Sequence, residues 1–166
     1  MKIFSVLFLS LLLFIFSCTE EENIDPNQSV EEEETDSMDV IELEVFKLIN
    51  NHRITSGLEA LSHNDIVYIQ AKSHSDSMAK GETDFGHDGF SERVELIKEQ
   101  ISIGTAGENV AYNFSNKPAE KVFEQWIESD GHRKNIENPK FTHGGIAMKK
   151  SGNGAYYFTH ILVEQK

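Results

Sequence analysis

The chain contains one cysteine, Cys18, so no disulfide can form within it. Small exported scaffolds built on disulfides are therefore excluded. A folded domain must instead be held by a buried apolar core. Residues 45–166 supply 122 positions, which is the size of one ordinary domain with a sufficient core. We expect a single domain over residues 40–166.

Charge divides the chain into two parts. Residues 19–44 hold 12 acidic and no basic side chains, whereas residues 45–166 hold 14 basic and 16 acidic ones. The domain is thus nearly neutral, and the acidity belongs to the segment before it. Because nucleic-acid binding needs a basic surface, we expect no nucleic-acid partner.

The N-terminus has the pattern of an export signal. Lys2 precedes an apolar run that ends at Phe16, which is shorter than the roughly 20 residues of a spanning helix. Residues 1–17 are predicted to be a signal peptide of lipoprotein type, because the run ends at Cys18 as in a bacterial lipobox. Acylation of Cys18 would anchor the chain to a bacterial membrane, with the outer membrane or cell surface as one location. The alternative is an ordinary cleaved signal with an incidental cysteine.

Residues 18–39 are acidic and poor in aromatics. Such a segment cannot bury enough apolar area to order itself, and like charges keep it extended. It is predicted to be a disordered tether that holds the domain away from the membrane.

The domain pattern predicts helices first and a terminal sheet. Apolar spacing and end signals predict helices over 41–55, 65–80, 91–97 and 118–130, with Asn64 or Asp65 capping the second, Ser91 capping the third and Gly131 stopping the last. A strand is predicted over 108–112. A hairpin follows, with strands over 145–150 and 155–164. This order favours the α+β class.

Three polar residues stand beside glycines: His87, Glu108 and His132. Two imidazoles and a carboxylate are a donor set for Zn²⁺ or another divalent cation, and without metal they suit proton transfer. Each residue also has a purely structural interpretation. His132 would cap a helix end, Glu108 would accept hydrogen bonds in a turn, and His87 would be a solvated loop residue.

The order of the motifs adds a resemblance. The sequence contains, in this order, Asn50-Asn51-His52-Arg53, Gly57-Leu58, His87 with Arg93, Gly107-Glu108-Asn109-Val110-Ala111, Trp126-Ile127-Glu128-Ser129-Asp130-Gly131-His132-Arg133-Lys134-Asn135, and Phe141 with Gly144-Gly145-Ile146. It resembles the CAP superfamily, the cysteine-rich secretory, antigen 5 and pathogenesis-related proteins that share the SCP domain. The resemblance covers about residues 41–164 and is nearest to the short bacterial type without cysteines.

This resemblance implies a three-layer α-β-α sandwich with an antiparallel central sheet, the C-terminal β-hairpin and a cleft lined by two His and two Glu. His87, Glu108 and His132 match three of these cleft positions. At the fourth position this chain has Ser129, and Glu124 and Glu128 are nearby substitutes. Arg93, Asn109 and Asn135 match structural hydrogen-bonding positions. His160 is expected to face either the cleft or the solvent.

The sequence is compatible with three functions. The first is a binding module whose cleft holds a divalent metal and recognises a lipid, glycan or protein. The second is a peptidase-like hydrolase, with Ser129 as nucleophile, His132 as base and Glu108 or Glu128 as the orienting group. The third is a purely structural His and Glu set.

Overall fold

The structure is a computed structural model that describes residues 38–166. The predicted signal peptide, the acylation of Cys18 and nearly all of the tether therefore lie outside the described residues. Within the described range, none of the helices has both the length and the apolar character needed to cross a membrane.

Five helices and four strands make up the described part of the chain. In order they are α1 (Val40–Thr55), β1 (Ser62–His63), α2 (Asp65–Lys80), α3 (Phe90–Lys98), β2 (Ile103–Asn113), α4 (Pro118–Glu128), α5 (Asp130–Ile136), β3 (His143–Lys150) and β4 (Tyr156–Gln165). The strands form one sheet in the order β1-β3-β4-β2.

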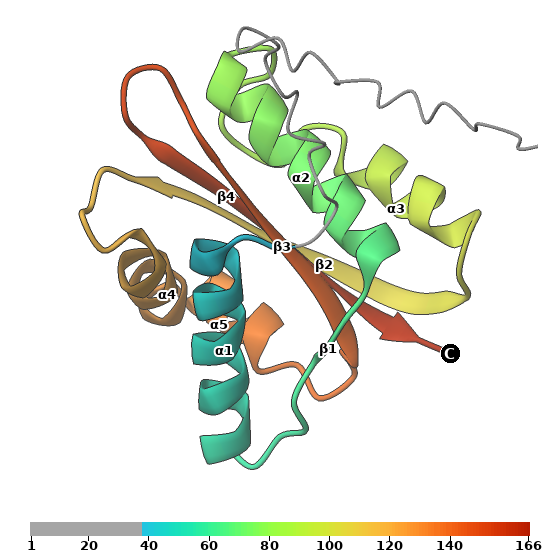
Figure 1. The fold of residues 1–166 in the computed structure, drawn as a ribbon. Helices are drawn as coiled ribbons and strands as arrows, with labels where there is room; N and C mark the ends of the chain where they lie inside the picture. The colour runs from blue at the N-terminus through green and yellow to red at the C-terminus, as the bar shows by residue number, and fades with distance from the viewer. Residues whose placement is uncertain (1–37) are drawn as a thin grey trace, which may run out of the picture. The chain divides into compact units, whose positions relative to one another are not determined.

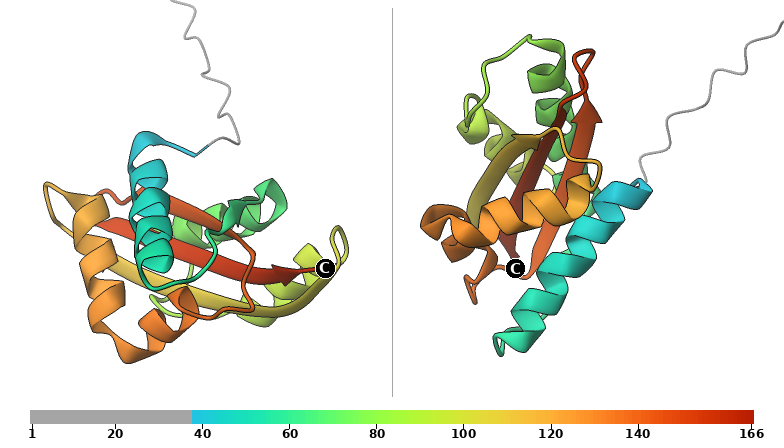
Figure 2. Two further views of the ribbon diagram at one scale, coloured as in Figure 1. Left: turned by 90° about the horizontal axis from the view of Figure 1, so that it is seen from below. Right: turned by 90° about the vertical axis from the view of Figure 1, so that its left-hand side faces the viewer.

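The sheet is the middle of three layers. Helices α2 and α3 cover one face, and α1, α4 and α5 lie on the other (Figure 1). The side view shows α1 and α4 crossing each other on their side of the sheet (Figure 2). Side chains alternate along β4 because successive residues of a strand point to opposite faces. Phe158 and Leu162 join the core under α1 and α4, whereas Ile161 and Val163 join the core under α2.

The prediction of an α+β three-layer sandwich with a C-terminal hairpin is confirmed, but the sheet is mixed rather than antiparallel. The two-residue strand β1 pairs parallel with β3, through Ser62 beside His143 and His63 beside Gly144. The other strand pairs, β3–β4 and β2–β4, are antiparallel. A two-residue strand has no periodicity of its own, so its pairing was not visible in the sequence.

Helix α2 has the ends that the sequence predicts. The Asn64 side chain accepts from the Val67 N–H, and Gly81 ends the helix in the left-handed conformation at φ 73°. The predicted ends of two other helices were wrong. Helix α3 begins at Phe90 after Gly89, with no side-chain cap from Ser91. Gly131 does not stop the fourth helix, because α4 already ends at Glu128 and Gly131 lies inside α5.

Helix α1 is fixed to the sheet at its N-terminus by Glu42. Its carboxylate accepts hydrogen bonds from the backbone N–H of Asp39 at 2.8 Å, the backbone N–H of Met148 at 2.7 Å and the Tyr68 hydroxyl at 3.1 Å. Burial raises the pKa of this carboxyl. The contacts join α1, α2 and β3 where the predicted tether meets the domain.

Candidate functional site

Glu108 is the centre of the predicted cleft. It lies on β2 and shares a sheet face with Ile161, its partner on β4, so its side chain lies on the α2 and α3 side. One carboxylate oxygen accepts from Arg93 of α3, with Nη2 at 2.6 Å and Nε at 3.1 Å. The other accepts from His87 Nδ1 at 2.9 Å. The Glu108 and Arg93 side chains are only 1% and 10% exposed, so this is a buried ion pair.

His87 is oriented by that hydrogen bond. It lies in the loop between α2 and α3, and its side chain is 53% exposed. A carboxylate can only accept, so the ring N–H on Nδ1 must donate to Glu108. In the neutral ring Nε2 then carries the lone pair and is available to another group. Glu108 thereby fixes both the tautomer and the orientation of His87.

His74 of α2 supports the same loop, and the sequence interpretation missed it. Its ring is buried, and Nε2 donates to the backbone carbonyl of Gly86 at 2.8 Å, directly before His87. Burial lowers the pKa of His74. A signal for it did exist in the sequence. His74 lies three residues after Ala71 and four before Met78, which is the spacing of one helix face.

Two asparagines fasten α5 to the outer edge of β2. Asn109 donates from Nδ2 to the backbone carbonyl of His132 at 3.0 Å. Asn135 donates to the backbone carbonyl of Glu108 at 3.1 Å and to Asn109 Oδ1 at 2.8 Å. These bonds satisfy a carbonyl of the edge strand and hold the His132 backbone beside Asn109 of β2. Asn109 and Asn135 therefore act as hydrogen-bonding positions, as does Arg93.

The His132 ring lies near His87. Burial lowers the pKa of His132, and the charge of His87 lowers it further. Within residues 38–166, His132 Nδ1 is buried and has no hydrogen-bond partner. The structure thus joins His87 of the loop directly to Glu108 of β2, and the charge of His87 acts on His132 of α5.

The other candidates are not joined to this cluster. Glu124 is exposed on α4 and pairs with Lys121 at 3.3 Å, and Glu128 is also exposed. Ser129 lies in extended backbone between α4 and α5. Within the described range, neither glutamate nor the Ser129 hydroxyl forms a hydrogen bond with His87, Glu108 or His132, so the arrangement shows no Ser–His nucleophile pair.

His160 faces neither the cleft nor the solvent, so both alternatives expected from the sequence were wrong. It is fully buried on the α1 and α4 side of the sheet, with its ring 5.8 Å from the Trp126 ring. Its neighbours Thr159 and Ile161 point to the opposite face. Burial lowers the pKa of His160 to about 3, and the positive charge of Arg53 adds to that shift.

Metal-ligand geometry is not preformed in the described residues. Between residues 38 and 166 no three His, Cys, Asp or Glu side chains are grouped so as to hold an ion. In addition, both oxygens of Glu108 are engaged by Arg93 and His87. The available donors in the cleft are the two imidazoles.

Comparisons with known proteins agree with the fold and the motifs. The family model described as the cysteine-rich secretory protein family (CAP) matches residues 46–163. The Bacillus subtilis protein YkwD is 36% identical over 120 residues, which are 70% of this chain and 46% of YkwD. The chain therefore spans less than half the length of this curated relative.

Two solved structures show the same fold. An outer surface protein of Borrelia burgdorferi matches with a TM-score of 0.64 at 18% identity, over 74% of this chain and 90% of its own. An extracellular protein from Bacillus anthracis that contains an SCP domain also matches with a TM-score of 0.64, at 25% identity, over 75% of this chain and 40% of its own.

Proposed function

Because the chain belongs to the cysteine-rich secretory protein family, we propose that it is an exported binding module whose ligand contacts the cleft of His87, Glu108 and His132. In this proposal Cys18 is acylated and anchors the chain to a bacterial membrane. The description of the two solved relatives as an outer surface protein and an extracellular protein supports export. The acidic segment after Cys18 would extend the reach of the domain from the membrane.

One observation carries the binding function: both oxygens of Glu108 are engaged by neighbouring side chains of the domain itself. A carboxylate held in this way is not available as a base or nucleophile. It does keep the His87 ring in a single orientation, with one nitrogen free. A rigid, pre-oriented polar group lowers the entropic cost of ligand binding. The same pairing would also orient His87 as a general base, but among the described residues the Ser129 hydroxyl forms no hydrogen bond with His87 or His132, so we favour recognition over hydrolysis.

This arrangement offers a divalent cation only two protein ligands. His87 would offer Nε2, and His132 would offer a second imidazole nitrogen. Zn²⁺ prefers such nitrogen donors, and a carboxylate behind a ligating His raises its basicity. Glu108 would then support His87 instead of binding the metal directly. Two protein ligands leave open positions for water or for a ligand atom, so we expect weak binding.

Zn²⁺ is expected to raise the melting temperature of the full chain in a concentration-dependent way, because an ion that binds only the native state stabilises it. At about 100 times the dissociation constant the gain is about 2.7 kcal/mol. The measurement is a thermal melt with EDTA and then with increasing Zn²⁺. His87→Ala and His132→Ala should each remove the shift.

The matched control is His143→Ala, on β3, which should keep the shift. A Zn²⁺ effect of equal size in all variants would place the metal elsewhere. No shift in the wild type would remove the metal from the proposal and leave the cleft as a metal-free binding site.

Acylation of Cys18 has a separate test. In a bacterial host the wild type is expected in the membrane fraction, because two or more acyl chains anchor a protein stably. Cys18→Ser should move the chain into the soluble exported fraction. A matched change in the tether, Thr19→Ser, should leave the membrane fraction unchanged. Equal fractionation of Cys18→Ser and wild type would contradict the anchor.

A further inference from the structure

The exposed aromatic residues of the described chain gather in one place. Phe85, Tyr112 and Phe114 are 49%, 43% and 63% exposed. The Tyr112 ring stacks on Tyr157 at 5.4 Å and meets the edges of Phe85 at 5.0 Å and Phe114 at 6.2 Å. We call these four residues the aromatic patch. The other large exposed apolar residues are aliphatic and lie on helices: Val40, Leu43, Ile54, Ile69 and Leu96.

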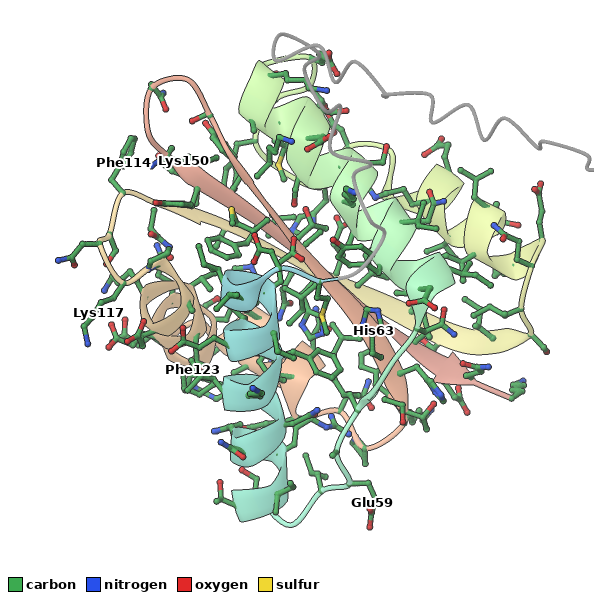
Figure 3. All side chains as sticks on the ribbon, viewed as in Figure 1. Glu59, His63, Phe114, Lys117, Phe123 and Lys150 are labelled. Atoms are coloured by element: carbon green, nitrogen blue, oxygen red, sulfur yellow. The ribbon has the colours of Figure 1, made fainter. Side chains whose placement is uncertain are left out.

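The patch lies on the same face of the sheet as the cleft. Tyr112 and Glu108 are four residues apart on β2, so they point to the same face and are separated by roughly 13 Å. Tyr157 on β4 is paired with Tyr112. Phe114 projects outward just beyond the end of β2 (Figure 3).

One loop connects the patch to the cleft. Phe85 packs on Tyr112 and Tyr157, and two residues later His87 bonds Glu108. Between them, the carbonyl of Gly86 is held by the buried ring of His74. His74 therefore holds the backbone between Phe85 and His87. A ligand that covers the patch and extends about 13 Å along the strand would reach the free nitrogen of His87.

We propose that the aromatic patch binds an uncharged glycan chain, with one sugar ring stacked on Tyr112 and following units directed toward His87 and His132. This names the ligand class of the binding module proposed above and rests on it. Aromatic rings present flat apolar faces with negative charge, which suit the weakly positive C–H groups of a pyranose. The imidazoles of the cleft can donate to, or accept from, sugar hydroxyls.

Charge argues against an anionic ligand. Lys149 lies beside Tyr157 in the pairing of β3 with β4, but its ammonium group is 3.5 Å from Asp76. Lys80, at the end of α2, lies 3.8 Å from the same aspartate. The residue before Phe85 is the acidic Asp84. Anionic membranes and nucleic acids are bound by clusters of available cations, and these lysines are paired.

Shape argues for a glycan over an acyl chain. An acyl chain needs apolar area of any kind, so aliphatic and aromatic side chains serve equally well. Here the exposed aliphatic residues lie on helices α1, α2 and α3, whereas the aromatic rings contact one another. Flat rings with polar groups at the same face are what distinguishes a sugar site from a lipid site.

The test is titration of the full chain with neutral oligosaccharides, using chitohexaose, cellohexaose and maltoheptaose as probes. We expect saturable binding of at least one probe. Tyr112→Phe keeps the flat ring and should bind within about twofold of wild type, whereas Tyr112→Leu keeps apolar area without the ring and should bind at least about tenfold more weakly. Leu96→Ala, an exposed aliphatic site, should have no effect. Melting temperatures check that each variant is folded.

The outcomes separate the two proposals. No binding of any probe, or equal binding by Tyr112→Phe and Tyr112→Leu, overturns the glycan site. Binding through Tyr112 of neutral phosphatidylcholine vesicles or of a proline-rich peptide, with no probe bound, also overturns it in favour of that ligand class. If a probe binds and is lost in His87→Ala but not in Tyr112→Leu, the cleft proposal stands and the aromatic patch falls.

Discussion

Replacing Arg93 by Met is expected to destabilise the domain by about 3–5 kcal/mol, because the change leaves a buried carboxylate without its cation. Glu108 is 1% exposed, and Arg93 bonds one of its oxygens twice. Arg93 also donates to the backbone carbonyl of Asp88 at 2.8 Å, which helps to hold the loop before α3. Urea denaturation of Arg93→Met and wild type at neutral pH measures the loss.

The double variant Arg93→Met with Glu108→Gln is the matched control. If an uncompensated charge is the main cost, removing the second charge should recover a large part of the lost stability. A double variant that is no more stable than Arg93→Met would show that packing of the arginine, not the ion pair, dominates. A loss below about 1 kcal/mol in Arg93→Met would contradict the burial of the pair.

Acid is expected to destabilise the domain through His160. Burial lowers the pKa of His160 from its ordinary 6.5 to about 3 in the folded chain. Above pH 6.5 the ring is neutral in the folded and the unfolded chain, so its protonation does not change the free energy of unfolding. Between pH 6.5 and about 3 the unfolded chain binds a proton that the folded chain does not. Stability therefore falls as the pH falls, by about 1.4 kcal/mol per pH unit.

His160→Leu should remove this contribution. Between pH 6.5 and about pH 5 the wild type should lose about 2 kcal/mol more than the variant. At neutral pH the variant should be at least close to wild type in stability, because both ring nitrogens of His160 are buried without hydrogen-bond partners within residues 38–166. Urea denaturation at the two pH values measures the difference. Equal losses in both proteins would show that the His160 ring gains a proton without unfolding.

The site is built from contacts on both sides of β2. The ion pair of Arg93 and Glu108 is buried on the α2 and α3 side, and it orients His87 at the surface. On the other side of β2, Asn109 and Asn135 hold α5 and thereby His132. The two histidines thus come from the two outer layers of the sandwich, on either side of the edge strand β2. A site of this kind requires the whole fold, and no single segment of the chain supplies it.

Features that depend on neighbours along the chain could be predicted from the sequence. Helix α2 has its cap at Asn64 and its stop at Gly81, and the C-terminal hairpin has its turn at residues 151–154. The order of motifs also identified His87, Glu108 and His132, and the first two are joined by a hydrogen bond. These signals are local, because caps, turns and motif spacing act over a few residues.

Other features depend on contacts between residues far apart in the chain. Helix α4 ends before Ser129, two residues ahead of the glycine that was expected to end it. Helix α5 is held to β2 by a hydrogen bond from the Asn135 side chain. Alternation along β4 predicts that the side chains of His160 and Thr159 point to opposite faces of the sheet. It does not predict which helices cover each face, because that depends on contacts between residues far apart in the chain. The same long-range packing left the rings of Tyr112 and Phe85 together at the surface.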